Sequence, residues 1–314
     1  MIRFFKNVTV LTVVLIFYYS MRCNAENEGG LPGVFSVSSD RKVCFSQGNL
    51  QYSNQGSHLV ADGRVIPGTW RFAGQQWIIA GMENSNVSGE YPGWIDLFAW
   101  GTSGFRSDVD QNAVNYQPYS VEKVMVSTRF NNFGYGPSSN MPNPDIAGTS
   151  HDWGVFNAVS NGGNKPGIWR TLTKKEWKYL FLSRPQAAEK CGIACVNGTN
   201  GIVLLPDDWT QPENVPFYAG FGPSDGGKYY DMQNSYTVEQ WKQMENGGAV
   251  FLPASGFRNG NRILYLGERA YYQSTDHYDA NFAYQVYFCS VAVNPNDSFQ
   301  RYYGTSVRLV KDVE

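Results

Sequence analysis

The sequence has little charge, and neither sign is in excess. Charged residues make up 17% of the chain, and 25 Lys and Arg balance 27 Asp and Glu to a formal net charge of -2. A chain with this balance has no general electrostatic attraction to nucleic acid or to an anionic membrane surface. We therefore expect no nucleic acid among its partners.

Histidine and cysteine are too few and too scattered for a zinc site. Cys191 and Cys195 have ligand-like spacing, but the three histidines, His58, His151 and His277, do not supply the second pair that such a site needs. A structural role for the cysteines is the simpler interpretation.

The pairing of the cysteines stays open at the level of the sequence. Four of them remain if Cys23 is lost by processing, and this even number suits an oxidising compartment. Cys191 and Cys195 can close a short loop, which leaves Cys44 and Cys289 as distant partners or as buried free thiols.

Signatures of common enzyme classes and of metal loops are also missing. The chain has no His-Glu-x-x-His, no Gly-x-Ser-x-Gly and no Gly-x-Gly-x-x-Gly after a strand. Residues 108–112 begin like a calcium loop, but Ala113 takes the place of the turn glycine and Tyr119 that of the bidentate glutamate. Asp207 and Asp208 follow a strand and can hold calcium or form a turn, and we favour the turn. We expect no cofactor, with a structural calcium ion as the open alternative.

The N-terminus has the pattern of a cleavable secretory signal. Arg3 and Lys6 precede an apolar run over residues 8–19, and Cys23 and Ala25 are small residues at the positions that a signal peptidase reads. We therefore predict a signal peptide over residues 1–25. The apolar run is shorter than the roughly 20 residues needed to cross a bilayer core, so we expect no transmembrane span.

The rest of the chain has the length of one large domain. We predict a short linker over residues 26–30 and a single domain over residues 31–314. The protein is then exported to the periplasm, the cell surface or the medium. A lipid anchor at Cys23 is the alternative, although the adjacent Arg22 is unfavourable for lipidation.

Aromatic residues and glycine are what the sequence has in abundance. The chain contains 9 Trp, 20 Tyr, 19 Phe and 33 Gly, a composition typical of a loop-rich structure held by large flat side chains. Residues 81–167 are rich in Gly, Asn, Ser and Pro but also carry Trp94, Trp100 and Trp153. We expect ordered loops there, because a flexible linker does not need tryptophan.

Two helices and several short strands are predicted from local signals. Thr173 with Glu176, and Thr237 with Gln240, have the spacing of capping boxes. The first helix places Trp177, Leu180 and Phe181 on its apolar face and stops at Arg184 and Pro185, and the second places Val238, Trp241 and Met244 there and stops at Gly247 and Gly248. Expected strands cover residues 34–38, 42–46, 49–52, 69–73, 76–80 and 284–288.

The helix pattern is repeated together with a following strand. Residues 201–206 and 248–253 both read Gly-x-Val-x-Leu-Pro, and each segment follows one of the predicted helices. We infer two quasi-equivalent helix and strand units in one α+β domain with two main helices, short strands and long ordered loops.

Two segments resemble the formylglycine-generating-enzyme, or sulfatase-modifying-factor, family. Residues 169–179, Trp-Arg-Thr-Leu-Thr-Lys-Lys-Glu-Trp-Lys-Tyr, resemble its Arg-Leu-Pro-Thr-Glu-Ala-Glu-Trp-Glu-Tyr segment, and residues 304–309, Gly-Thr-Ser-Val-Arg-Leu, resemble its terminal Gly-Phe-Arg-Cys strand. The resemblance implies a C-type-lectin-like fold of the sulfatase-modifying-factor type.

Further segments resemble exported, repeatedly duplicated C-type-lectin-like proteins of gut-type Gram-negative anaerobes. These segments cover residues 31–37, 45–52, 93–104, 169–177 and 204–209, so the resemblance extends over nearly all of the predicted domain. It indicates the fold better than the function, because one fold serves many functions.

The resemblance also bears on catalysis. Enzymes of the sulfatase-modifying-factor type use a cysteine directly after the terminal arginine, and Leu309 follows Arg308 in this chain. Leucine cannot serve as a thiolate ligand or nucleophile. We therefore expect a non-catalytic protein, with a divergent enzyme of that family as the alternative.

The C-terminal segment, residues 271–303, has the composition of a binding surface. It is similar to the variable segment of C-type-lectin-fold proteins diversified by retroelements, with Tyr272-Gln273-Ser274-Thr275 in place of the Tyr-Trp-Ser-Ser frame. Tyrosine gives a large contact area at small entropic cost, and small polar side chains adapt their hydrogen bonds. The predicted contacts to a protein or glycan ligand are Gln273, Asp276, His277, Tyr278, Asn281, Phe282, Asn296, Phe299, Gln300, Tyr302 and Tyr303.

Overall fold

The computed structural model describes residues 28–86, 89–105, 145–222, 230, 234–279 and 281–313. The predicted signal peptide, the processing site and the calcium-like residues 108–119 lie outside this part of the chain. Within it, no helix has the length and the apolar character needed to cross a membrane.

The fold is mostly β, so the predicted α+β class with two main helices is wrong. Strands account for 39% of the structure and helices for 14%, and the described part contains three α-helices. Both predicted helices exist, but α3 (Lys174–Lys178) has only 5 residues and α5 (Val238–Asn246) has 9. The capping boxes are strong local signals for helices, whereas the long C-terminal strands have only weak local signals. The sequence therefore overstated the helical content and understated the strand content.

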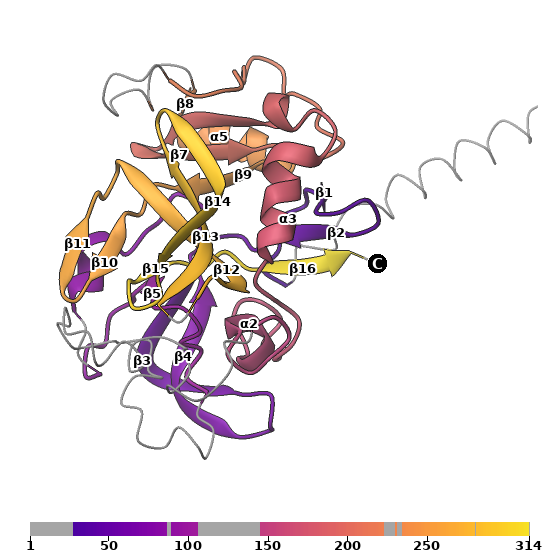
Figure 1. Cartoon of the computed structure of the whole chain (residues 1–314). Coiled ribbons are helices and arrows are strands. Elements are labelled where there is room, and N and C mark those ends of the chain that lie inside the picture. Colours follow the sequence, from indigo (N-terminus) through magenta and orange to yellow (C-terminus); the bar gives the residue numbers. More distant parts are fainter. Residues whose placement is uncertain are drawn as a thin grey trace, which may run out of the picture.

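The largest sheet of the described chain has five strands, four of them from its C-terminal part (Figure 1). In spatial order its strands are β14 (Ala292–Gln300), β13 (Phe282–Cys289), β12 (Arg269–His277), β15 (Thr305–Ser306) and β5 (Leu97–Phe98). Helix α3 lies on one side of the β12, β13 and β14 strands and the β10 and β11 hairpin on the other (Figure 1). Of these strands only β13 was predicted. Pro295 and the three Asn and Asp residues around it hide β14 in the sequence.

The remaining strands form four smaller sheets. The four-stranded sheet has the order β8 (Ser235–Tyr236), β6 (Cys191–Val196), β7 (Thr199–Leu204) and β9 (Val250–Pro253). The three-stranded sheet has the order β1 (Phe35–Ser36), β2 (Lys42–Phe45) and β16 (Val310–Val313). The two hairpins are β3 (Leu50–Leu59) with β4 (Val65–Phe72), and β10 (Phe257–Asn259) with β11 (Arg262–Leu264).

The four-stranded sheet is buried on both faces, and the two predicted helices cover opposite faces. On β7, Ile202 and Leu204 belong to the core that contains Trp177 of α3, whereas Val203 belongs to the core that contains Trp241 of α5. This assignment follows the two-residue period of a strand. The two helix and strand units are therefore not equivalent, although β7 and β9 pair with each other in antiparallel register.

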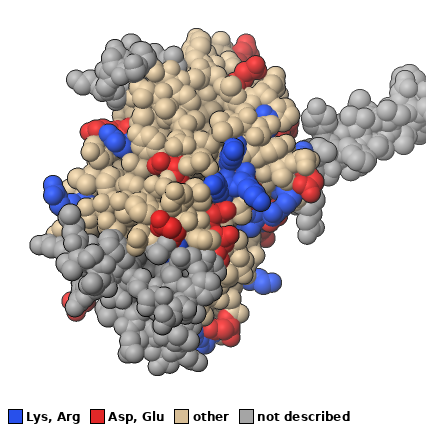
Figure 2. All heavy atoms as spheres, in the orientation of Figure 1, with Lys and Arg blue, Asp and Glu red and all other residues tan. Residues whose placement is uncertain are grey.

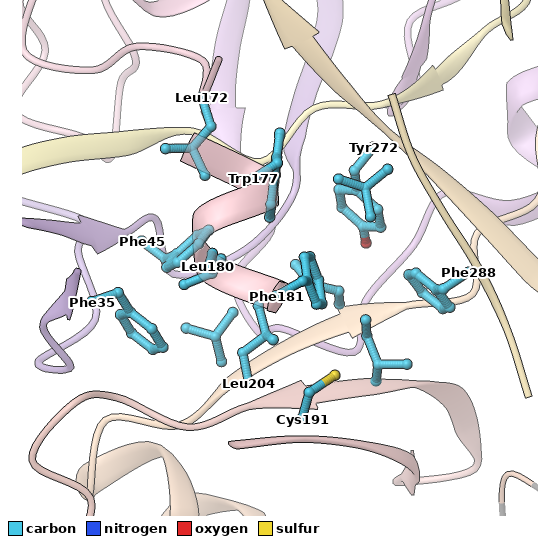
Figure 3. Packing of buried hydrophobic residues seen from close by; sticks show 14 of the residues in the cluster. Phe35, Phe45, Leu172, Trp177, Leu180, Phe181, Cys191, Leu204, Tyr272 and Phe288 are labelled. Atoms are coloured by element: carbon cyan, nitrogen blue, oxygen red, sulfur yellow. The ribbon is translucent and has the colours of Figure 1, made fainter. Parts of the chain in front are cut away.

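The largest core cluster lies between the four-stranded and five-stranded sheets. Figure 3 shows Trp177, Phe181 and Leu180 of the α3 segment among side chains from both sheets, with Tyr272 and Phe288 from the five-stranded one. All of these side chains are buried. The structural role predicted for Trp177 is consistent with this burial.

Both helix starts have the predicted hydrogen bonds. Thr173 and Glu176 form a complete capping box, and so do Thr237 and Gln240. After α3 the chain continues as a π-helix (Tyr179–Ser183), and a 3₁₀ turn (Ala187–Lys190) leads into β6. One further 3₁₀ turn (Gly81–Ser85) and helix α2 (Trp153–Phe156) lie in the loop region.

Some local predictions need correction. Residues 76–80 do not form a strand, because the side chain of Gln76 bonds Phe251 and Ala249 while the segment runs through a turn. Val238 is 36% exposed and so does not belong to the buried face of α5. Of the predicted loop region, residues 87–88 and 106–144 lie outside the described part of the chain. In the described part, Trp100 and Trp153 are fully buried.

Candidate ligand-binding site

Seven aromatic rings gather on one face of the five-stranded sheet, and we name this group the aromatic face. Its members are Phe257, Tyr265, Tyr271, Tyr287, Phe299, Tyr302 and Tyr303. The rings of Tyr271 and Phe299 are stacked at 4.1 Å between centroids, and Phe257 meets Phe299 edge-on at 5.0 Å. The edge-on pair lies in the usual range of favourable aromatic contacts, and the stacked pair is closer than that range.

The strand register explains why these rings meet. Tyr271 lies opposite Tyr287, and Phe299 lies opposite Ala283, so all four side chains point to the same side of the sheet. The rings of Tyr271 and Phe299 are stacked although β12 and β14 are not neighbouring strands. Side chains from β12 and β14 therefore meet over the strand between them.

Tyr265 is held at the margin of the aromatic face in an unusual backbone conformation. Its φ of 57° is left-handed, which is costly for a residue with a bulky side chain. The ring is 44% exposed, and the Arg269 guanidinium carbon lies 3.7 Å from its centroid. The contact with the cation and the stacking on Phe257 offset part of the strain.

Two hydroxyl groups of the aromatic face, those of Tyr271 and Tyr302, have a pKa above the ordinary value. Burial raises the pKa of Tyr271, and burial together with the neighbouring Tyr303 raises the pKa of Tyr302. Neutral phenols both donate and accept hydrogen bonds. On β14, loss of solvation also raises the pKa of Asp297.

A second, smaller group lies at the end of the same sheet but on the side of α3. The Lys174 Nζ lies 3.3 Å from the centre of the Tyr284 ring, and Tyr278 meets that ring edge-on at 5.2 Å. One carboxylate oxygen of Asp276 accepts a hydrogen bond from the backbone N–H of Lys174. We name Lys174, Asp276, Tyr278, Phe282 and Tyr284 the tip cluster.

The predicted ligand contacts are divided between these groups. Phe299, Tyr302 and Tyr303 belong to the aromatic face. Asn296 and Gln300 lie on β14 beside it, whereas Asp276, Tyr278 and Phe282 belong to the tip cluster, and His277 and Asn281 lie next to that cluster in the chain. The Nδ1 atom of His277 lies 2.7 Å from a carboxylate oxygen of Asp145.

Gln273 is buried, unlike the other predicted ligand contacts, which are exposed or partly exposed. Only 1% of Gln273 is exposed, and its amide nitrogen donates to the carbonyl of Phe98 and to the hydroxyl of Thr305. The cause is its place on β12, which has a neighbouring strand on each side.

Several members of the aromatic face were not predicted from the sequence. Tyr271 and Tyr287 alternate with core residues on long strands, and this alternation was the available signal. Phe257 and Tyr265 lie outside the C-terminal segment and flank the Asn259-Gly260 turn of the β10 and β11 hairpin. An Asn-Gly pair between apolar residues is a strong hairpin signal, but it does not say which sheet the hairpin covers.

The cysteine pairings considered for the sequence do not form. None of Cys191, Cys195 and Cys289 takes part in a disulfide. Cys191 and Cys195 lie on one extended strand, where four residues span roughly 13 Å, well beyond the reach of a disulfide. Burial raises the pKa of the Cys191 thiol to about 12, so it carries no thiolate at neutral pH.

The positions weighed for metal or catalysis are part of the structural framework. Leu309 is fully buried in a core cluster. A carboxylate oxygen of Asp207 accepts hydrogen bonds from the backbone and the hydroxyl of Ser36, and the residue lies in a turn, which agrees with the favoured interpretation. In the described ranges, no three His, Cys, Asp or Glu side chains are grouped as for a metal ion.

Charged side chains are few on the face of the molecule shown in Figure 2. On the face shown in Figure 2, Lys and Arg gather over α3 and β16, and the rest of the described surface is mostly uncharged. Arg170 near this group is paired with Glu176 and Asp312 at 2.8 and 2.7 Å. The network joins the start of α3 to the C-terminal strand.

Comparison of the chain with family models, with curated proteins and with solved structures gave no match. The resemblance to the sulfatase-modifying-factor family and to exported proteins of gut-type anaerobes therefore stays a prediction.

Proposed function

We propose that the protein is an exported, non-catalytic recognition protein that binds a glycan or protein ligand through the aromatic face. One observation carries the proposal. Seven rings from five segments of the chain form a continuous set of contacts at the protein surface, and the residues at its margin are partly exposed. Binding surfaces are enriched in such aromatic anchors.

The chemistry of the aromatic face suits recognition. Tyr265, Tyr302 and Tyr303 combine a flat apolar body with a hydroxyl group, so they can bury area and still make directed hydrogen bonds. The contacts among the rings hold them in place before a ligand arrives. Such preorganisation lowers the entropic cost of binding.

A non-catalytic role is supported by the state of the groups that catalysis of the resembled family would need. The residue after Arg308 is a buried leucine, Leu309, and leucine offers no thiolate. The proposal of export rests on the N-terminal signal pattern alone.

Alanine substitutions on the aromatic face test this function. A ligand would first be sought by glycan array and by pull-down of proteins with the mature chain. We expect the double variant Tyr302→Ala and Tyr303→Ala to weaken binding at least about tenfold, or about 1.4 kcal/mol. Tyr218→Ala is the matched control, because Tyr218 is 56% exposed but is not part of the aromatic face.

The competing location is the tip cluster. If binding survives the double variant and is lost instead in Tyr278→Ala, the ligand contacts the tip cluster and the proposed site is wrong. Melting temperatures of all variants show whether a loss of binding is a loss of fold.

A further inference from the structure

A row of three polar side chains crosses the aromatic face beneath its rings. Gln273 on β12 lies opposite Gln285 on β13, which lies opposite Asp297 on β14. Tyr287 follows Gln285 on the same face of β13, and Ala283 precedes it. We name Gln273, Gln285 and Asp297 the polar row.

Gln285 has no hydrogen-bond partner although it is buried. Only 1% of the residue is exposed, and neither its amide nitrogen nor its amide oxygen has a partner among the described residues. On the neighbouring strand β12, the amide oxygen of Gln273 also has no hydrogen-bond partner among the described residues. Native proteins rarely leave buried amides unpaired, because the lost solvation costs free energy.

The unpaired amide lies under a removable cover. Tyr271 is in register with Tyr287 and Phe299 with Ala283, so their stacked rings meet diagonally above Gln285, which lies midway between them on β13. Both rings belong to side chains, so a change of rotamer can move them apart without unfolding of the strands.

We propose that the polar row is a subsite for the adjacent hydroxyl groups of a neutral sugar ring, and that the Tyr271 and Phe299 rings part to admit it. This inference rests on the proposed function and names its ligand class. The Gln285 amide presents a donor and an acceptor side by side, and two adjacent hydroxyls can accept from one and donate to the other.

The surroundings of the polar row favour a sugar over a peptide or an anion. The Asp297 carboxyl group can accept a hydrogen bond from a further hydroxyl of the sugar. The parted rings of Tyr271 and Phe299 offer flat surfaces to the C–H groups of the sugar ring. The row itself contains two amides and one carboxyl group and no cation, so an anionic ligand gains nothing from it.

The variant Gln285→Leu tests whether Gln285 binds a sugar or is only an unfavourable polar residue in the core. Leucine has a similar volume and no polar atom, so removal of the unpaired amide should leave the melting temperature unchanged or raise it. Binding of methyl glycosides of glucose, galactose and mannose, measured by saturation-transfer NMR, should fall at least about tenfold. Glucuronic acid is the charged comparison and should bind more weakly than the neutral sugars.

Gln76→Leu is the matched control for stability. Gln76 is also a buried glutamine, but its amide bonds Glu245, Ala249, Phe251 and Arg308. Its replacement should lower the melting temperature and leave the affinity of the remaining folded protein for sugar unchanged. Loss of stability in Gln285→Leu would show that the amide is satisfied in the native protein and would overturn the inference.

The remaining outcomes distinguish this inference from the proposed function. If no methyl glycoside binds, or if all bind Gln285→Leu as they bind the original protein, the sugar subsite is wrong. The proposed function then still stands if a protein ligand depends on Tyr302 and Tyr303. If sugars depend on Gln285 but not on those tyrosines, the subsite stands and the outer part of the proposed site fails.

Discussion

At the scale of single residues, the core contains several polar groups whose partners determine their chemistry. Asp152 is fully buried, and its carboxylate accepts hydrogen bonds from the backbone and hydroxyl of Thr171 and from the backbone of Gly154. Burial outweighs these bonds and raises the pKa of Asp152 to about 6, against an ordinary value of 3.8. The native protein therefore holds this proton more tightly than the unfolded chain does.

The raised pKa of Asp152 predicts a defined dependence of stability on pH. Its contribution is fully present below about pH 4, decreases as the pH rises to about 6, and is absent above that, a difference of about 3 kcal/mol. In Asp152→Asn this part of the dependence should disappear. Urea denaturation of both proteins across this range measures it, and equal slopes would contradict the assignment.

The helix tryptophans lead to a second prediction at this scale. Trp177 and Trp241 are fully buried in different core clusters. Replacement of either by alanine should lower the free energy of unfolding by roughly 3 to 5 kcal/mol, as for large core aromatics. Trp94→Ala is the control, because Trp94 is only half buried and stacks on Arg71. An effect of Trp241→Ala no larger than that of the control would refute the packing of α5.

At the scale of elements, the repeated Gly-x-Val-x-Leu-Pro strands show what a glycine contributes. On β7, a Cβ at Gly201 would lie 2.3 Å from the carbonyl oxygen of Leu252 on β9. The two strands pair at this point, with Gly201 opposite Pro253. The glycine permits a backbone approach that no other residue allows.

Gly201→Ala should therefore weaken the pairing of β7 and β9. The added methyl must displace backbone, so we expect a loss of at least about 1 to 3 kcal/mol. Gly74→Ala serves as the control, because a Cβ at Gly74 would meet nothing within 4 Å. Thermal denaturation compares the two variants, and equal melting temperatures would show that the sheet tolerates the methyl group.

At the scale of the whole molecule, the two ends of the described chain are joined in one sheet. Strand β16 pairs with β2 over four residue pairs, and the ion pairs of Arg170 and Arg41 with Asp312 hold the same region. The C-terminal strand is therefore part of the framework that positions α3. The predicted export signal precedes the described residues in the sequence.

Processing at the N-terminus is the prediction that belongs to this scale. If the signal pattern is read as we expect, the mature protein begins at Glu26. Mass spectrometry of the native protein measures this directly. A diacylglyceryl adduct on Cys23 would show instead that the protein is lipid-anchored.

The sequence by itself determined the features that depend on a few neighbouring residues. Both capping boxes, the stops after α3 and α5 and the β13 strand are readable because each rests on hydrogen bonds or dihedral preferences within a few positions. Part of the aromatic face was readable too, since Phe299, Tyr302 and Tyr303 lie close together in the chain.

Only the tertiary structure decided which side of a sheet each of these elements covers. The sequence treats α3 and α5 alike, but they lie on opposite faces of the four-stranded sheet. In the sequence, Gln273 and Tyr303 look equally suited to ligand contact. In the structure, Gln273 is buried on β12 between two neighbouring strands, whereas Tyr303 lies among the rings of the aromatic face. Phe257 joins Phe299 across more than forty residues of chain because strand register and hairpin placement bring them together, and a local sequence pattern contains neither.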